Sequence, residues 1–92
     1  MFSHVMLGAD DVEASRAFYD AVIGALGGKP GRVDDKGRAV FIHDGGVLML
    51  SKPLDGGPAS CGNGSTIGFK AASSEQVHAW HEARLAHGGT AI

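Results

Sequence analysis

Apolar and polar residues recur along the first part of the chain with two different periods. Residues 2–8 interleave Val5 and Leu7 with small or polar residues, which predicts a short strand. Over residues 12–26 the apolar side chains return at three- and four-residue steps, which predicts an amphipathic helix. Two residues are equally good N-caps: Asp10, which has capping-box spacing to the glutamate at position 13, and Asp11. The glycine pair at 27–28 ends the helix.

Strand-like segments follow this helix. Residues 29–35 predict a weak, partly polar strand, and residues 38–42 and 47–51 predict the two arms of a hairpin with its turn at 43–46. Residues 53–64 are dense in glycine and proline and must form a loop.

The opening pattern then returns. Residues 66–71 predict a strand, and a serine cap at position 73 or 74 precedes a helix over residues 77–87. A second glycine pair at 88–89 ends that helix, and residues 90–92 begin a new segment. Two capped helices that end in paired glycines can also occur by coincidence, because both features are common.

If the repeat is real, the fold is α+β: a βαβββ module followed by an incomplete second copy. The expected division is a first module at 1–52, a glycine- and proline-rich loop at 53–64 and an incomplete second module at 65–92. The remaining strands of the second copy would be supplied from elsewhere, or the chain is a fragment. An incomplete second copy leaves strand edges and an apolar sheet face uncovered, which predicts a homodimer.

Composition narrows the classes of function. A length of 92 residues allows one small domain, and 43% hydrophobic with 20% charged residues is typical of a soluble protein. A net charge of -2 with scattered lysine and arginine argues against nucleic acid as a partner. The apolar runs are too short to span a membrane, and no secretion signal opens the chain. The single cysteine, Cys61, fits a reducing compartment, so a cytoplasmic location is expected.

The segment from His4 to Tyr19 carries a more specific pattern. It has a strand that begins at His4, an aspartate cap, Ser15 within the helix, a Phe-Tyr pair and a glycine-rich close. This pattern resembles the opening of vicinal-oxygen-chelate proteins, the glyoxalase/bleomycin-resistance/dioxygenase superfamily. The resemblance extends over the chain, with residues 47–51 as the fourth strand and 64–69 as the fifth. It implies two βαβββ modules whose curved sheets enclose a cleft, and a dimer.

The same resemblance speaks against the family's standard metal centre. Metal-binding relatives hold a divalent ion with ligands from the first, fourth, fifth and eighth strands. Carried over by position, His4 matches the first ligand, but Met49 stands where a carboxylate or another ligand is expected and Thr66 where histidine is expected. A thioether and a hydroxyl do not replace these groups for Zn, Ni, Fe or Mn. No cofactor is therefore expected, and His4 is the one matching ligand position.

Strand alternation extends the resemblance to a candidate site. If Leu48 and Leu50 face the helices, the alternate residues of the same strand line the cleft, and Thr66 and Gly68 lie opposite. Whether Phe41 or Ile42 joins that face depends on the hairpin length. The predicted substrate-binding residues are His4, Val47, Met49, Ser51, Thr66 and Gly68. No catalytic residue is assigned beyond His4 as a weak candidate, and two simpler interpretations remain: His4 as a structural histidine and Met49 as core filling.

Three functions compete at this point. The first is a metal-free module of the bleomycin-resistance type that binds a small oxygenated metabolite in the cleft. The second is a glyoxalase-like lyase, isomerase or dioxygenase that uses His4 in a modified metal centre. The third is a non-catalytic structural fragment. The absent carboxylate and histidine favour the first, and whether the chain is an enzyme stays open because fold does not fix function.

Overall fold

The computed structural model describes residues 1–60 and 62–88. The predicted beginning of a strand at 90–92 and the surroundings of Cys61 lie outside these residues. The elements in chain order are β1 (Val5–Gly8), α1 (Val12–Gly24), β2 (Arg32–Val33), β3 (Ala39–His43), β4 (Gly46–Ser51) and α2 (Ser74–Ala86).

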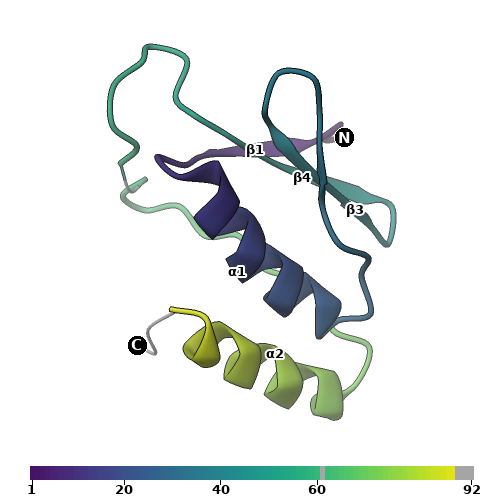
Figure 1. Ribbon diagram of the computed structural model, residues 1–92. Helices are drawn as coiled ribbons and strands as arrows, with labels where there is room; N and C mark the ends of the chain where they lie inside the picture. The colour runs from purple at the N-terminus through teal and green to yellow at the C-terminus, as the bar shows by residue number, and fades with distance from the viewer. Residues whose placement is uncertain (61, 89–92) are drawn as a thin grey trace.

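A four-stranded mixed sheet organises the structure, with the strand order β1-β4-β3-β2. β1 runs parallel to β4, and the other pairs are antiparallel. The parallel pair needs a long crossover, and α1 begins that crossover on one side of the sheet. Figure 1 shows α1 below the sheet and α2 below α1, so both helices lie on the same side. This is the βαβββ arrangement that the sequence predicts.

Side-chain caps fix where each helix begins, and they settle the choices that the sequence leaves open. The carboxylate of Asp11 accepts a hydrogen bond from the backbone N–H of Ala14 at 3.1 Å and caps α1. Asp10 instead accepts from the backbone N–H of Ala59 at 2.7 Å, so it holds the long loop. Ser73 caps α2 through the N–H of Gln76 at 3.2 Å.

The core lies between α1 and strands β3 and β4, and it comprises Val22, Ile23, Ala39, Phe41, Leu48 and Leu50. Aromatic rings extend the core outward. The ring centroid of Tyr19 lies 6.1 Å from that of Phe41 and 6.5 Å from that of Phe69, and the ring centroids of Phe69 and Trp80 are 6.2 Å apart. Burial of the Tyr19 phenol raises its pKa above the usual value. This chain of rings connects the sheet through α1 and the segment before α2 to α2 itself.

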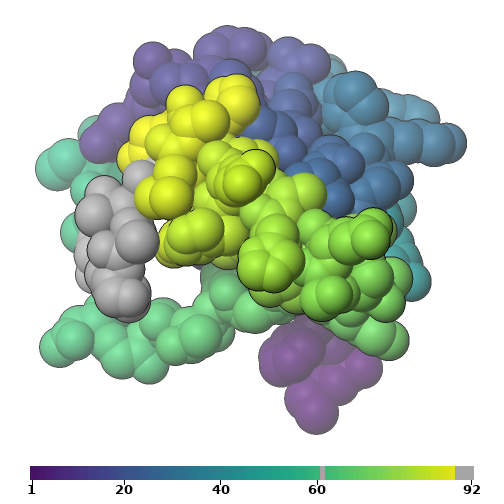
Figure 2. All heavy atoms as spheres, turned by 90° about the horizontal axis from the view of Figure 1, so that it is seen from below, coloured from purple at the N-terminus to yellow at the C-terminus, as the bar shows by residue number. Residues whose placement is uncertain are grey.

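The predicted strand at 66–71 is wrong: these residues form no part of the sheet. A strand requires a hydrogen-bonding partner, and residues 1–60 and 62–88 place none beside this segment. α2 consequently packs on α1 rather than on a second sheet. Figure 2 shows α2 lying across the surface seen from below, and none of its described side chains is fully buried.

Candidate functional site

The two faces of the sheet differ in what covers them. Leu48 and Leu50 of β4 are buried beneath α1, as alternation predicts. On the opposite side, no helix among the described residues covers the sheet (Figure 1). We call this side the open face and define it by Met6, Val40, Ile42, Val47, Met49 and Ser51. It is the surface that a second sheet would have to face to form a cleft.

Hairpin length decides which β3 residues belong to the open face. Asp44 has φ 50° and Gly45 has φ 80°, so they form a two-residue turn with both dihedrals positive. This turn pairs Ile42 with Val47 and Phe41 with Leu48. Ile42 therefore joins the open face, and Phe41 enters the core.

The middle of the open face is formed by methionine and valine. The register places Met6 beside Met49, and Met49 beside Val40. Ile42 is 66% exposed and Met6 39%, whereas Phe41, the neighbour of Ile42 in β3, is 2% exposed. Val40, Val47 and Met49 between them are half-buried. An apolar sheet surface that no helix covers marks a place where a ligand or another chain binds.

The remaining predicted site residues are distributed unevenly. His4 is exposed, and its Nδ1 atom lies 2.8 Å from the Oγ atom of Ser3. Because Val5 is paired with Leu48, His4 lies one residue before β1 at the level of Val47. Thr66 and Gly68 are exposed and lie outside any strand, so the structure does not place them on a facing sheet.

The chemistry of the open face suits apolar contacts better than metal binding. Within residues 1–60 and 62–88, no three His, Cys, Asp or Glu side chains come together as a cation site. The thioethers of Met6 and Met49 occupy the centre of the face, and thioethers are poor ligands for Zn, Ni, Mn or non-haem Fe. These side chains instead offer polarizable, adaptable contact surface.

A separate cavity of about 270 Å³ lies on the helix side of the sheet. Core side chains line it together with the segment before α2: Val5, Ile23, Leu26, Phe41, Leu48, Ile67 and Phe69. Val47 and Gly68 also border it, but the other four predicted site residues do not. His43, the last residue of β3, is half-buried at the edge of this cavity. We interpret the cavity as the gap left where residues 66–71 pass the sheet without pairing.

A charged pair lies at one end of the open face. The Nε atom of Arg38 donates to Oδ2 of Asp34 at 2.7 Å, and Oδ1 accepts the backbone N–H groups of Arg38 at 2.9 Å and Lys36 at 3.0 Å. The backbone N–H of Arg38 contributes most to lowering the pKa of Asp34, with smaller contributions from the guanidinium and from Lys36 that partial desolvation opposes. Sequence reasoning missed Arg38, although it is in phase with Val40 and Ile42.

The lowered pKa of Asp34 gives a pH-dependent contribution to stability. A carboxyl whose pKa is lower in the folded state stabilises the fold above its unfolded value, here near 3.8, and loses that contribution as pH falls through the folded value. We expect the melting temperature to decrease as the pH is lowered through this acid range, and to decrease less steeply in Asp34→Asn. Thermal denaturation followed by circular dichroism between about pH 6 and pH 2 checks this. Parallel curves for the two proteins would contradict the assignment.

Comparison with known proteins places this geometry in context. The sequence model of the Glyoxalase/Bleomycin resistance protein/Dioxygenase superfamily matches residues 1–92. Among solved structures, a glyoxalase/bleomycin resistance protein from Albidiferax ferrireducens T118 is 47% identical and superposes with a TM-score of 0.93. The match covers 100% of this chain and 75% of that one. A search of curated proteins finds no match. No helix in the described part of the chain is both long and apolar enough to cross a bilayer.

Proposed function

The chain belongs to the Glyoxalase/Bleomycin resistance protein/Dioxygenase superfamily, and from that premise we propose that it binds a small oxygenated metabolite on the open face. The observation that carries this proposal is the uncovered row of Met6, Met49 and Val40, beside Ile42 and Val47. An apolar wall with a few polar groups at its edge is the usual composition of a small-molecule site. His4 and Ser51 supply such groups here.

The proposal includes the absence of the standard four-ligand metal centre. At the first-strand position His4 is compatible with a metal, but a thioether at Met49 and a hydroxyl at Thr66 are not. Binding would then rest on shape and apolar contact rather than on chelation of the metabolite's oxygens. We place the protein in the cytoplasm because its single cysteine suits a reducing compartment.

A second copy of the chain is the proposed cover for the open face. Exposed apolar residues such as Ile42 and Met6 stabilise a protein only when something removes them from water. A homodimer would close the site between two chains. Light scattering after size exclusion is expected to give the mass of a dimer, and a monodisperse, well-folded monomer would count against this part of the proposal.

Thermal-shift screening against aromatic and polyoxygenated compounds tests the binding function itself. A ligand present at about 100 times its Kd stabilises the folded state by about 2.7 kcal/mol, which raises the melting temperature of a domain of this size by roughly 10 °C or more. We expect several such compounds to raise it in metal-free buffer. If none does at millimolar concentration, the chain is better described as a structural fragment.

The metal-dependent alternative keeps one supporting observation, the exposed imidazole of His4 at the level of Val47. We expect protein purified from metal-supplemented growth to contain well under one equivalent of Ni, Zn, Fe or Mn by elemental analysis. His4→Ala should leave that content unchanged, with His78→Ala, an exposed helix residue, as the matched control. A stoichiometric metal that only His4→Ala removes would favour a lyase, isomerase or dioxygenase.

A further inference from the structure

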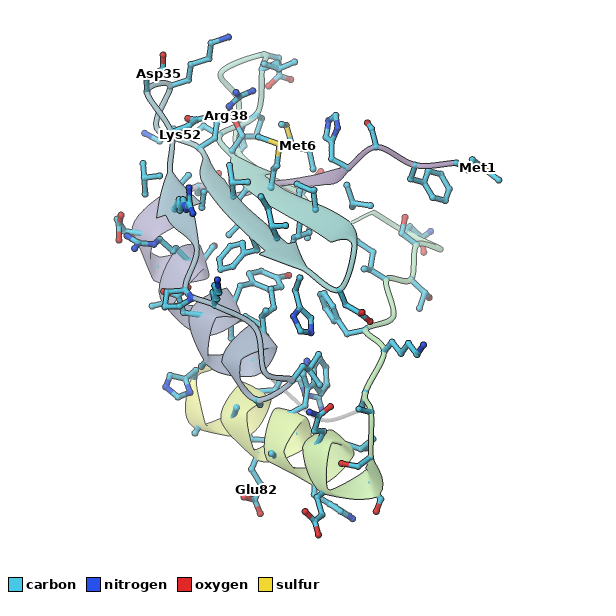
Figure 3. The ribbon with its side chains drawn as sticks, turned by 90° about the vertical axis from the view of Figure 1, so that its right-hand side faces the viewer. Met1, Met6, Asp35, Arg38, Lys52 and Glu82 are labelled. Carbon is cyan, nitrogen blue, oxygen red and sulfur yellow. The ribbon has the colours of Figure 1, made fainter. Side chains whose placement is uncertain are left out.

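Two arginine side chains lie at one end of the open face. Because Ala39 is paired with Leu50, Arg38 lies beside Ser51 at the point where β3 begins. Figure 3 shows Met6 and Arg38 on the side of the sheet away from the helices. Arg32 of β2 is exposed and is paired with Val40. The methionine row therefore ends beside two arginines, Arg38 and Arg32.

The guanidinium of Arg38 is held in place and retains unused donors. Its Nε atom donates to Asp34, and no hydrogen bond from its two Nη atoms occurs within residues 1–60 and 62–88. The side chain is 32% exposed, so these donors can reach a ligand. Asp34 is occupied by three N–H groups, which makes it a support for Arg38 rather than a competitor for a ligand.

Among the charged residues at this end of the open face, Arg38 is the best suited to bind an anion. Lys52 shares a shallow hollow with Asp10, and Asp35 lies beside Lys36 in the turn before β3. Each of these lysines therefore has an acidic residue near it, whereas Arg32 adds positive charge on the side of β2. A planar guanidinium with two free Nη groups matches the geometry of a carboxylate or phosphate better than a lysine does.

On the premise that the open face is the ligand site, we propose that its ligand is a small organic oxyanion. The Nη atoms of Arg38 bind the carboxylate or phosphate group, and the apolar body of the ligand rests on Met6 and Met49. This assigns to Arg38 the selection of acidic over neutral metabolites. The net charge of -2 for the whole chain makes such a local preference depend on this residue rather than on the overall field.

The test uses phenyl phosphate, benzoate and the neutral benzamide as probes, with binding followed by backbone amide chemical shifts. We expect both anions to shift the amides of Arg38, Met49 and Ser51 and to bind about tenfold more tightly than benzamide. Arg38→Gln should remove this preference and Arg38→Lys should keep part of it. Lys29→Gln, which removes the same charge after α1, should leave it intact.

The outcomes separate this inference from the proposed function. Equal shifts of the open-face amides by all three probes would keep the open face as the site and overturn the role of Arg38. Anion shifts confined to other parts of the chain would also overturn it, while the thermal-shift screen decides the binding function independently. If Arg38→Gln does not fold, a salt titration of the unaltered chain suffices. Raising NaCl from about 50 to about 500 mM should weaken the binding of the two anions but not the binding of benzamide. Equal weakening for all three probes would overturn the proposal.

Discussion

Replacing Phe41 with alanine is expected to lower the free energy of unfolding by about 3–5 kcal/mol. The ring is 2% exposed, contacts Tyr19 of α1, and packs closely enough on Gly31 that a Cβ atom there would lie 2.6 Å from it. Alanine would leave a cavity between α1 and the sheet that the surrounding backbone cannot fill. Since small domains are stable by about 5–15 kcal/mol, chemical denaturation should show a large loss.

Ile42→Ala is the matched control for this prediction, because Ile42 is the next residue of the same strand. It is 66% exposed on the open face, so its truncation should cost less than about 1 kcal/mol in the monomer. At protein concentrations low enough to dissociate the proposed homodimer, a cost for Ile42→Ala as large as that for Phe41→Ala would mean that β3 is turned over. The open face would then be the core, and the assignment of the site would fail.

Met49→Asp is expected to abolish binding of the compounds that stabilise the unaltered chain. The register places Met49 between Met6 and Val40, at the centre of the proposed contact surface. A ligand resting there would bury an unpaired carboxylate, which costs about 2 kcal/mol or more and weakens affinity roughly thirtyfold or more. Isothermal titration of the two proteins with one such compound measures this difference.

Val33→Asp provides the comparison for that experiment. Val33 is 46% exposed and is paired with Ala39, a core residue, so it belongs to the other side of the sheet at its edge. The same loss of an apolar side chain and gain of a charge should leave affinity within about threefold. Similar losses in both variants would point to a general effect of charge on the sheet rather than to a site at Met49.

Much of the first module could be predicted from the sequence because its determinants are local. The helix from Val12 follows from the spacing of its apolar residues and its aspartate cap, and the burial of Leu48 and Leu50 follows from strand alternation. The face occupied by Ile42 could not be predicted, because it depends on whether the hairpin turn holds two residues or three. One residue of difference reverses every side chain of a strand.

The strand predicted at 66–71 failed for a reason that local patterns do not contain. Its residues have strand-like composition, but a strand forms only beside a partner, and the described residues supply none there. Thr66 and Gly68, predicted to face Met49, depend on that pairing, so their place in a site stays a prediction. Arg38 was overlooked because a charge next to a turn is ordinarily solvated, and its link to Asp34 appears only in three dimensions.

A crystal structure of the chain with one stabilising compound from the screen tests the central claim most directly. The account predicts the compound on the outer side of the sheet, within van der Waals contact of Met6 and Met49 and with no cation at His4. A compound seated in the helix-side cavity among Phe41, Ile67 and Phe69 would contradict it, as would a metal ion coordinated by His4.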